Sequence, residues 1–269
     1  GFPRAPPLPA RAPPMPRFEI LDWYDAPQYY DIIFDTDTAK EVDFLEGLLA
    51  RHGLARTRAQ RSVLEPACGS GRFLVEFARR GWRVEGFDAS RPMLDFAAER
   101  LRASGLEGVL RTGRMERYGS RRRHELVHCL VSTFKYLLTE EHARGFLVSA
   151  AEVLVDGGLL ALGFHLTQYD YDEIDLERWR GERGDAKVVC TIEGWPADRK
   201  RRLERCRSRL TVQEAGRLRR LETEWSFRTY DARQTRRLLA SVPELEHVAT
   251  YDFTYDLDAP RELDDRQLD

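Results

Sequence analysis

The stretch VLEPACGSGRFLVEFA, residues 63–78, combines the end of an apolar strand, a glycine turn and an amphipathic helix. Glycines after a strand let a ligand approach the backbone closely, and the helix that follows offers free N–H groups at its start. A dinucleotide-binding turn has the pattern G-x-G-x-x-G. Gly69 and Gly71 match this pattern, but Leu74 stands at the third position. The turn therefore predicts a nucleotide-like ligand without the full dinucleotide signature.

Two acids near this turn narrow the choice of ligand. Glu65 lies four residues before Gly69, and Asp88 ends the next expected strand. A carboxylate beside the turn would repel a pyrophosphate and would suit an ammonium group. An acid at the end of the second strand accepts hydrogen bonds from ribose hydroxyls. The ligand should therefore have a ribose, a cationic amino group and no phosphates, and S-adenosylmethionine has all three properties.

Strand and helix patterns alternate over the first two thirds of the chain. Strands are expected at 62–66, 83–88, 109–112, 125–131 and 159–165, and helices at 39–53, 71–80, 91–103 and 140–154. This alternation predicts a doubly wound, Rossmann-like α/β fold, whose mostly parallel sheet is covered by helices on both faces.

The pattern changes after the fifth strand. Residues 187–227 contain three strand-like runs with no helix between them, which predicts an antiparallel β insert. A four-residue hairpin loop at 213–216 would place Arg207 opposite Glu222. The same register would place Arg205 opposite Glu224, so that the basic face of the insert is partly neutralised.

These patterns divide the chain into four parts. Residues 1–17 are predicted to form a proline-rich, disordered arm, and residues 18–165 an α/β domain that binds S-adenosylmethionine. Residues 166–229 form the antiparallel insert, which we expect to roof the substrate. Residues 230–269 complete the main domain with a helix at 232–241 and a last strand near 246–255.

Composition argues against several classes of function. The chain has 269 residues and a formal net charge of −2, so no basic excess points to nucleic acid or to an anionic membrane. Its four cysteines form no C-x-x-C pair and have no histidine at zinc-ligand spacing, which predicts free thiols in a reducing cytoplasm and no metal site. No apolar run reaches the length of about 18 residues that a transmembrane helix needs. The sequence indicates no particular oligomeric state.

Five blocks in order carry a resemblance to a known family. The blocks are VLEPACGSGR (63–72), VEGFDASRPMLDFA (84–97), TGRMERY (112–118), ELVHCLVSTFKYL (125–137) and LVDGGLLAL (154–162). Together they closely resemble class I S-adenosylmethionine-dependent methyltransferases of the type that acts on small molecules. The resemblance implies that the cofactor, and its product S-adenosylhomocysteine, contact Tyr30, Glu65, Ala67, Gly69, Gly71, Asp88, Ala89, Met93, Met115 and Leu130.

The sequence departs from the family pattern at three places. Ala67 stands where many relatives have glycine, and Arg114 stands where many have an aspartate that binds the adenine amino group. The family sheet also ends in two C-terminal strands, whereas this sequence predicts one. The expected adenine contact is therefore lost or is made by backbone atoms, and the sheet is truncated or completed in another way.

Candidate substrate contacts follow the expected fourth and fifth strands. His165 is either a catalytic base or substrate contact, or a rim histidine bonded to a loop. Phe134, Tyr136 and Tyr169 either wall a substrate pocket or fill the core. We expect N- or O-methylation of a small metabolite. The alternatives are an RNA methyltransferase that uses the arginine-rich segment 199–220, and a protein that binds S-adenosylmethionine without catalysis.

Overall fold

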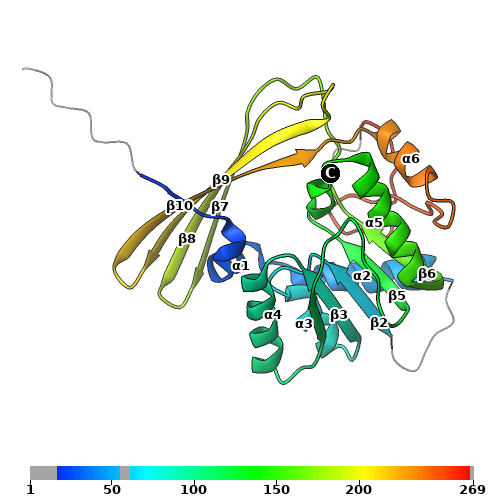
Figure 1. Cartoon of the computed structure of the whole chain (residues 1–269), viewed down its shortest axis with the longest axis horizontal. Helices are drawn as coiled ribbons and strands as arrows, with labels where there is room; N and C mark the ends of the chain where they lie inside the picture. Colours follow the sequence, from blue (N-terminus) through cyan, green and yellow to red (C-terminus); the bar gives the residue numbers. More distant parts are fainter. Residues whose placement is uncertain (1–16, 55–60, 267–269) are drawn as a thin grey trace, which may run out of the picture.

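The computed structural model describes residues 17–54 and 61–266, so residues 1–16 of the predicted arm lie outside the described residues. Its main sheet has the strand order β4-β3-β2-β5-β6, and every pair of neighbours is parallel (Figure 1). The strands are β2 (Ser62–Pro66), β3 (Arg83–Asp88), β4 (Val109–Thr112), β5 (His124–Cys129) and β6 (Leu154–Leu162). The helices that connect them are α3 (Arg72–Arg79), α4 (Arg91–Ala103) and α5 (Glu140–Val153).

Helices cover both faces of this sheet. Successive residues of a strand point to opposite faces, so neighbouring residues pack into different clusters. On β2, Val63 packs into a cluster with helices α2 (Thr38–His52) and α3, whereas Leu64 packs into a second cluster with α5 and α6 (Ala232–Ala240). The predicted doubly wound sheet is therefore confirmed. No helix in the described part of the chain is long and apolar enough to span a membrane.

A second sheet has the order β1-β10-β9-β8-β7 and contains the predicted insert. Its strands are β1 (Glu19–Ile20), β7 (Asp175–Arg183), β8 (Ala186–Gly194), β9 (Leu203–Glu214) and β10 (Arg217–Arg228). Strands β8 to β10 are antiparallel, as predicted, β7 pairs with β8 in the antiparallel direction, and β1 adds to β10 in parallel. The sequence reasoning missed β1 and β7, which form the two edges of the sheet.

The inner face of the insert packs against the N-terminal segment that contains η1 (Trp23–Asp25) and α1 (Pro27–Phe34). Trp23 stacks on Trp225 of β10 with ring centroids 4.7 Å apart. Tyr29 and Tyr30 lie within α1, a helix before the first one expected at 39–53, and the sequence reasoning missed it. The N-terminal segment therefore lies between the insert and the main domain (Figure 1).

The predicted hairpin register is wrong by two residues. Arg217 pairs with Glu214, so the loop has two residues, Ala215 and Gly216, instead of four. Both adopt positive φ, at 48° and 74°, as a tight primed turn requires. A shift of two keeps every side chain on its predicted face, because the side-chain period of a strand is two.

The corrected register changes the partners of the arginines and keeps them paired. Arg207 lies opposite Glu224, and Arg209 lies opposite Glu222. Nε of Arg209 is 2.7 Å from the Glu222 carboxylate, and Nε of Arg207 is 2.7 Å from Glu193 of β8. The basic face of the insert is therefore partly neutralised by its own glutamates, as predicted.

The predicted last strand near 246–255 is also wrong. In the described residues this segment forms one isolated bridge, between Thr250 and Arg261, and joins neither sheet. Tyr251 and Tyr255 pack against Phe44 of α2 instead, with ring centroids 5.5 and 5.4 Å from that of Phe44. The main sheet is therefore not extended beyond β6 by the described C-terminal residues.

Candidate functional site

The glycine turn after β2 lies at the rim of the main sheet, where the carboxyl ends of the parallel strands meet. Ala67, Gly69 and Gly71 have φ of 52°, 51° and 74°, in the left-handed region. A Cβ on Gly71 would lie 2.8 Å from the Cβ of Ala97 on α4, whereas a Cβ on Gly69 would meet nothing within 4 Å. Gly71 is thus required for close helix packing, and Gly69 leaves space for a ligand beside the turn.

Asp88 ends β3, as predicted, and its side chain contacts this turn. Its Oδ2 accepts a hydrogen bond from the backbone N–H of Gly69 at 2.8 Å, and its Oδ1 accepts one from Ser90 at 2.8 Å. Burial raises the pKa of Asp88, and these two backbone donors oppose the shift. Each oxygen keeps a second lone pair, which ribose hydroxyls can use.

Glu65 has an unusual environment for a carboxylate. It lies on β2 with 7% of its surface exposed, and its Oε2 has no hydrogen-bonding partner among the described residues. Burial raises the pKa of Glu65 well above its usual range, although the nearby Arg72 guanidinium acts in the opposite direction. A buried carboxylate oxygen without a donor is costly unless a ligand supplies one. The site therefore fits a ligand with an ammonium group beside Glu65 and a ribose beside Asp88.

Comparison with known proteins agrees with this geometry. Residues 63–158 match the profile of the family described as "Methyltransferase domain". The match covers less than half of the chain, and within it the similarity is to methyltransferases. The resemblance predicted from the five sequence blocks is thereby confirmed for the central part of the chain.

Curated relatives of this methyltransferase domain include two Streptomyces enzymes. A dTDP-3-amino-3,4,6-trideoxy-alpha-D-glucopyranose N,N-dimethyltransferase from Streptomyces venezuelae is 28% identical over 141 residues, which are 51% of this chain and 56% of that protein. A dTDP-3-amino-3,6-dideoxy-alpha-D-glucopyranose N,N-dimethyltransferase from Streptomyces fradiae is 31% identical over 134 residues, 48% of this chain and 49% of that protein. The chain thus matches about half the length of these relatives.

Solved structures share the fold over most of the chain. DesVI from Streptomyces venezuelae has a TM-score of 0.68 at 20% identity and covers 83% of this chain and 91% of its own. An S-adenosylmethionine-dependent methyltransferase from Clostridium acetobutylicum has a TM-score of 0.66 at 18% identity, with 81% and 86% covered. These likenesses confirm the Rossmann-like fold.

The other predicted cofactor residues of the methyltransferase domain surround the same rim. Met93 is fully buried on α4, and Ala89 is exposed just before that helix. Leu130 follows β5, and its carbonyl oxygen accepts a hydrogen bond from the N–H of Thr133 at 3.3 Å. Arg114 is exposed and pairs with Glu116. Arg114, which stands where many relatives have an adenine-binding aspartate, thus pairs with a neighbouring glutamate.

Tyr30 and Tyr136 meet in an aromatic cluster between the rim and the insert. The ring of Tyr30 lies 5.4 Å from that of Tyr24, whose hydroxyl donates to the Tyr136 hydroxyl at 2.8 Å. Tyr136 also meets the ring of Phe227 on β10, with centroids 4.8 Å apart. We name this cluster the aromatic wall. Its members are Trp23, Tyr24, Tyr30, Tyr136, Trp225 and Phe227.

The remaining predicted substrate residues lie in other surroundings. Phe134, in η2 (Thr133–Tyr136), is fully buried in the core against Phe146 and Tyr230. The hydroxyl of Tyr169 lies 2.7 Å from Oγ1 of Thr229, where the insert ends. These contacts match the core-packing alternative for Phe134 and a structural contact for Tyr169.

His165 lies three residues after the end of β6 and is exposed. Its backbone N–H donates to Oγ of Ser132 at 3.4 Å, and its ring lies 4.9 Å from the ring of Phe253. The backbone of His165 is thus bonded to the loop after β5, while the role of its ring stays a prediction. Within the described residues no group of three or more His, Cys, Asp or Glu side chains could hold a metal ion.

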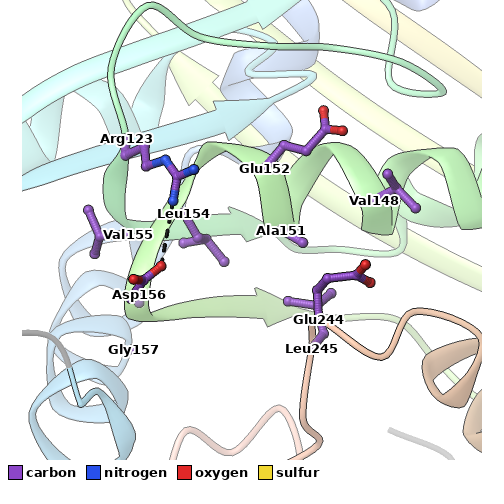
Figure 2. A pocket seen from close by; sticks show the side chains of 11 residues that line it. Arg123, Val148, Ala151, Glu152, Leu154, Val155, Asp156, Gly157, Glu244 and Leu245 are labelled. Atoms are coloured by element: carbon purple, nitrogen blue, oxygen red, sulfur yellow. Dashed lines mark ion pairs between the residues drawn. The ribbon is translucent and has the colours of Figure 1, made fainter.

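A surface hollow occurs near the amino ends of strands β5 and β6, at the end of the main sheet opposite to the glycine turn (Figure 2). It lies where β5 and β6 begin, and Arg123 and Asp156 pair across it at 3.5 Å. Ligands of parallel α/β sheets bind at the carboxyl ends of the strands. The hollow therefore lies away from the candidate site.

Sequence reasoning missed the residues that support the site from outside the motif. Asp31 of α1 accepts a hydrogen bond from Ser70 inside the glycine turn at 2.5 Å. Lys135, which is 4% exposed, pairs with Glu204 of β9 at 2.7 Å and so ties the rim to the insert. Both pairs join segments far apart in the chain, and a sequence pattern carries no signal for them.

Proposed function

We propose that this protein is an S-adenosylmethionine-dependent methyltransferase that methylates a small metabolite in the cytoplasm. The observation that carries the proposal is the unpartnered, buried carboxylate oxygen of Glu65, next to a glycine turn that Asp88 holds in place. A buried carboxylate selects for a ligand cation, and it disfavours the phosphates of a dinucleotide. The match of residues 63–158 to the methyltransferase domain family supports the same cofactor.

When bound, S-adenosylmethionine supplies an electrophilic methyl group on its sulfonium. Glu65 would bind the ammonium of the methionine part, and Asp88 the ribose hydroxyls. The turn from Ala67 to Gly71 would contact the ligand through backbone atoms. Ala89, Met93 and Met115 would line the adenine. The protein thus contributes mainly orientation and exclusion of water, which methyl transfer between two bound molecules needs most.

The aromatic wall is the proposed acceptor side of the site. Trp225 and Phe227 reach it from the inner face of the insert, and Tyr136 reaches it from the rim. The indole N–H of Trp225 has no hydrogen-bonding partner among the described residues. A buried donor of this kind fits an oxygen of the acceptor, and the rings favour a compact, partly apolar molecule. The insert would then act as the substrate roof.

We favour nitrogen over oxygen as the accepting atom, and an amino sugar as the class of acceptor. Two curated relatives carry names of N,N-dimethyltransferases of dTDP-amino sugars. A neutral amine attacks without prior loss of a proton, whereas a hydroxyl needs a base in the transition state. His165 is exposed and contacts Ser132 and Phe253. An amine acceptor would thus not depend on His165 as a base.

The test is methyl transfer from labelled S-adenosylmethionine by the full chain. Acceptors would be dTDP-linked 3-amino sugars, with the matched 3-hydroxy sugars as controls. We expect label in the amine and none in the hydroxy compound. Labelling of the hydroxy compound alone would overturn the choice of nitrogen. Binding of S-adenosylhomocysteine without transfer to any small amine would favour a non-catalytic role, and no binding at all would overturn the proposal.

A further inference from the structure

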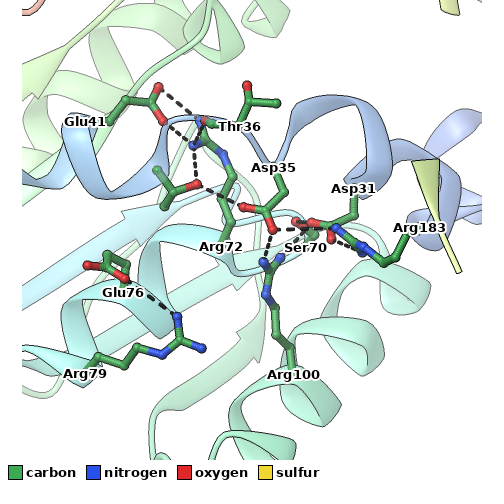
Figure 3. A network of polar contacts seen from close by, with 11 residues as sticks. Asp31, Asp35, Thr36, Glu41, Ser70, Arg72, Glu76, Arg79, Arg100 and Arg183 are labelled. Atoms are coloured by element: carbon green, nitrogen blue, oxygen red, sulfur yellow. Dashed lines mark hydrogen bonds and ion pairs between the residues drawn. The ribbon is translucent and has the colours of Figure 1, made fainter. Parts of the chain in front are cut away.

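A buried carboxylate links the glycine turn to three other parts of the chain. Asp31 of α1 has a side chain that is 1% exposed. Its Oδ1 accepts from Oγ of Ser70 at 2.5 Å and from Nη1 of Arg100 on α4 at 2.7 Å. Its Oδ2 accepts from Nη1 of Arg183, at the end of β7, at 2.6 Å. Figure 3 shows these groups converging, with Asp35 beside both arginines. We call them the Asp31 network.

The glycine turn depends on support of this kind. Ser70 lies between Gly69 and Gly71, two residues with left-handed backbones and no side chains to fix them. The N–H of Gly69 is held from one side by Asp88, and the hydroxyl of Ser70 is held from the other side by Asp31. Glycine-rich backbone loses more entropy on ordering than other segments. A turn that is already ordered therefore binds its ligand with a smaller entropic cost.

One strand of the insert takes part in this support. Strand β7 lies close to α1. A Cβ on Gly181 would collide with the carbonyl oxygen of Ile32, so only glycine fits at this approach. From the same face of β7, Arg183 reaches both Asp31 and Asp35. A chain of contacts therefore runs from the insert through Arg183 and Asp31 to Ser70 in the turn.

We infer that Asp31 and Arg183 are positioning residues for the cofactor, and that they couple the insert to the glycine turn. This inference rests on the proposed function, because it assigns the turn to the cofactor and the insert to the acceptor. A cofactor that orders the glycine turn also stabilises β7 in its position against α1. An acceptor that holds the insert in place stabilises the glycine turn in the same way. Binding linkage is reciprocal, so cofactor and acceptor each strengthen the binding of the other by the same factor.

Replacement of Arg183 can test the coupling without unfolding the protein. The side chain of Arg183 is 49% exposed, and Arg100 still neutralises Asp31 when Arg183 is absent. Partly exposed ion pairs contribute little to the stability of a fold. Arg180 offers a matched control, because it is exposed on the opposite face of the same strand.

The experiment measures the Kd of S-adenosylhomocysteine by calorimetry for the full chain and its variants. We expect Arg183→Met to raise Kd by about fivefold, the low end of site-to-site couplings, at an unchanged Tm. Arg180→Met should leave Kd unchanged, and Arg183→Lys should recover most of the affinity. Equal Kd values for Arg183→Met and wild type, with tight binding by both, would overturn the inference and leave the proposed function intact.

A double-mutant cycle tests whether the effect passes through Asp31. Ser70→Ala and Arg183→Met should each raise Kd, and the double variant should raise it by less than the product of the two factors. In hydrogen exchange, S-adenosylhomocysteine should protect β7 in the wild type and not in Arg183→Met, while the turn stays protected in both. Fully multiplicative factors, or protection of β7 in both proteins, would show that the insert is not coupled to the turn. Absence of binding to the wild type would instead overturn the proposed function.

Discussion

The clearest prediction concerns Glu65→Gln, which removes the charge of the proposed ammonium partner and keeps its shape. Hydrogen bonds to charged groups contribute about 1.5–3 kcal/mol. The loss of this pair should therefore raise the Kd of S-adenosylhomocysteine by roughly 10- to 150-fold, at 1.4 kcal/mol for each factor of ten. Glu65 is only 7% exposed, so water screens its interaction with the ammonium group little. The increase in Kd should therefore lie toward the upper end of this range.

The same residue should make binding depend on pH. Burial raises the pKa of Glu65 in the free protein, and an ammonium beside it would lower that pKa again. At a pH below the pKa of Glu65 in the ligand-free protein, ligand binding must release the proton of Glu65. The affinity should therefore fall by up to about tenfold for each unit by which the pH is lowered. The pH series should run from neutral pH downward, where the α-ammonium group of the ligand stays charged throughout.

The effect on folding has the opposite sign and serves as the control. An acid whose pKa is raised by folding binds protons more tightly in the native state, so it lowers stability as the pH rises above its unfolded value. Glu65→Gln removes this cost and should raise the Tm of the ligand-free protein near neutral pH. A variant that is more stable and binds less tightly cannot be explained by misfolding.

Calorimetry in two buffers of different ionisation enthalpy measures affinity and proton release together. The reasoning fails if wild-type protein binds S-adenosylhomocysteine with no proton release and no pH dependence. It fails also if Glu65→Gln binds as tightly as wild type. Either result would mean that Glu65 does not face the ammonium, although the carboxylate is buried at the turn.

Three further predictions address the ribose, the roof and the arginines. Asp88→Ala should weaken S-adenosylhomocysteine binding by ~1–3 kcal/mol in calorimetry, because it removes a charged acceptor and frees the N–H of Gly69; an unchanged affinity would exclude Asp88 as the ribose ligand. Trp225→Phe should raise the KM for the acceptor and leave the Kd of S-adenosylhomocysteine unchanged; equal losses in both, with a lower Tm, would show a structural role only. Arg207 and Arg209 pair with glutamates, so filter binding of single-stranded RNA should be weak and lost as salt rises; tight binding at physiological salt that disappears on Arg→Ala substitution would favour RNA as the substrate.

The main sheet could be predicted because its signals are local. Apolar runs bounded by glycine turns identified β2 and β3, and the expected helix at 91–103 coincides with α4. Strand β7 was missed because its sequence, DLERWRGER, is polar on both faces, as suits an exposed edge. The pattern of alternating aromatic and polar residues at 246–255 suggested a strand, but the segment packs on α2 without a sheet neighbour.

The hairpin register shows a different limit. A two-residue loop at 215–216 requires Ala215 to adopt the left-handed region, which residues with a Cβ rarely occupy. Local preference therefore favoured a longer loop. In the structure twelve residue pairs join β9 and β10, from Arg217 opposite Glu214 to Arg228 opposite Leu203. Cross-strand packing and pairing along this ladder outweigh the small local cost of one strained alanine.

The support of the site could not be predicted for a related reason. The motif residues Glu65, Gly69 and Asp88 are readable because each lies at the end of a strand whose pattern is clear. Asp31 and Arg183 are separated by 152 positions and look like ordinary surface charges in the sequence. A buried ion cluster adds little to stability over an apolar one, because desolvation offsets the attraction between the charges. What it does provide is direction, because Arg100 and Arg183 bind the carboxylate of Asp31 in a position from which it also accepts a hydrogen bond from Ser70. This is why the network is better explained by the placement of the glycine turn than by the stability of the fold.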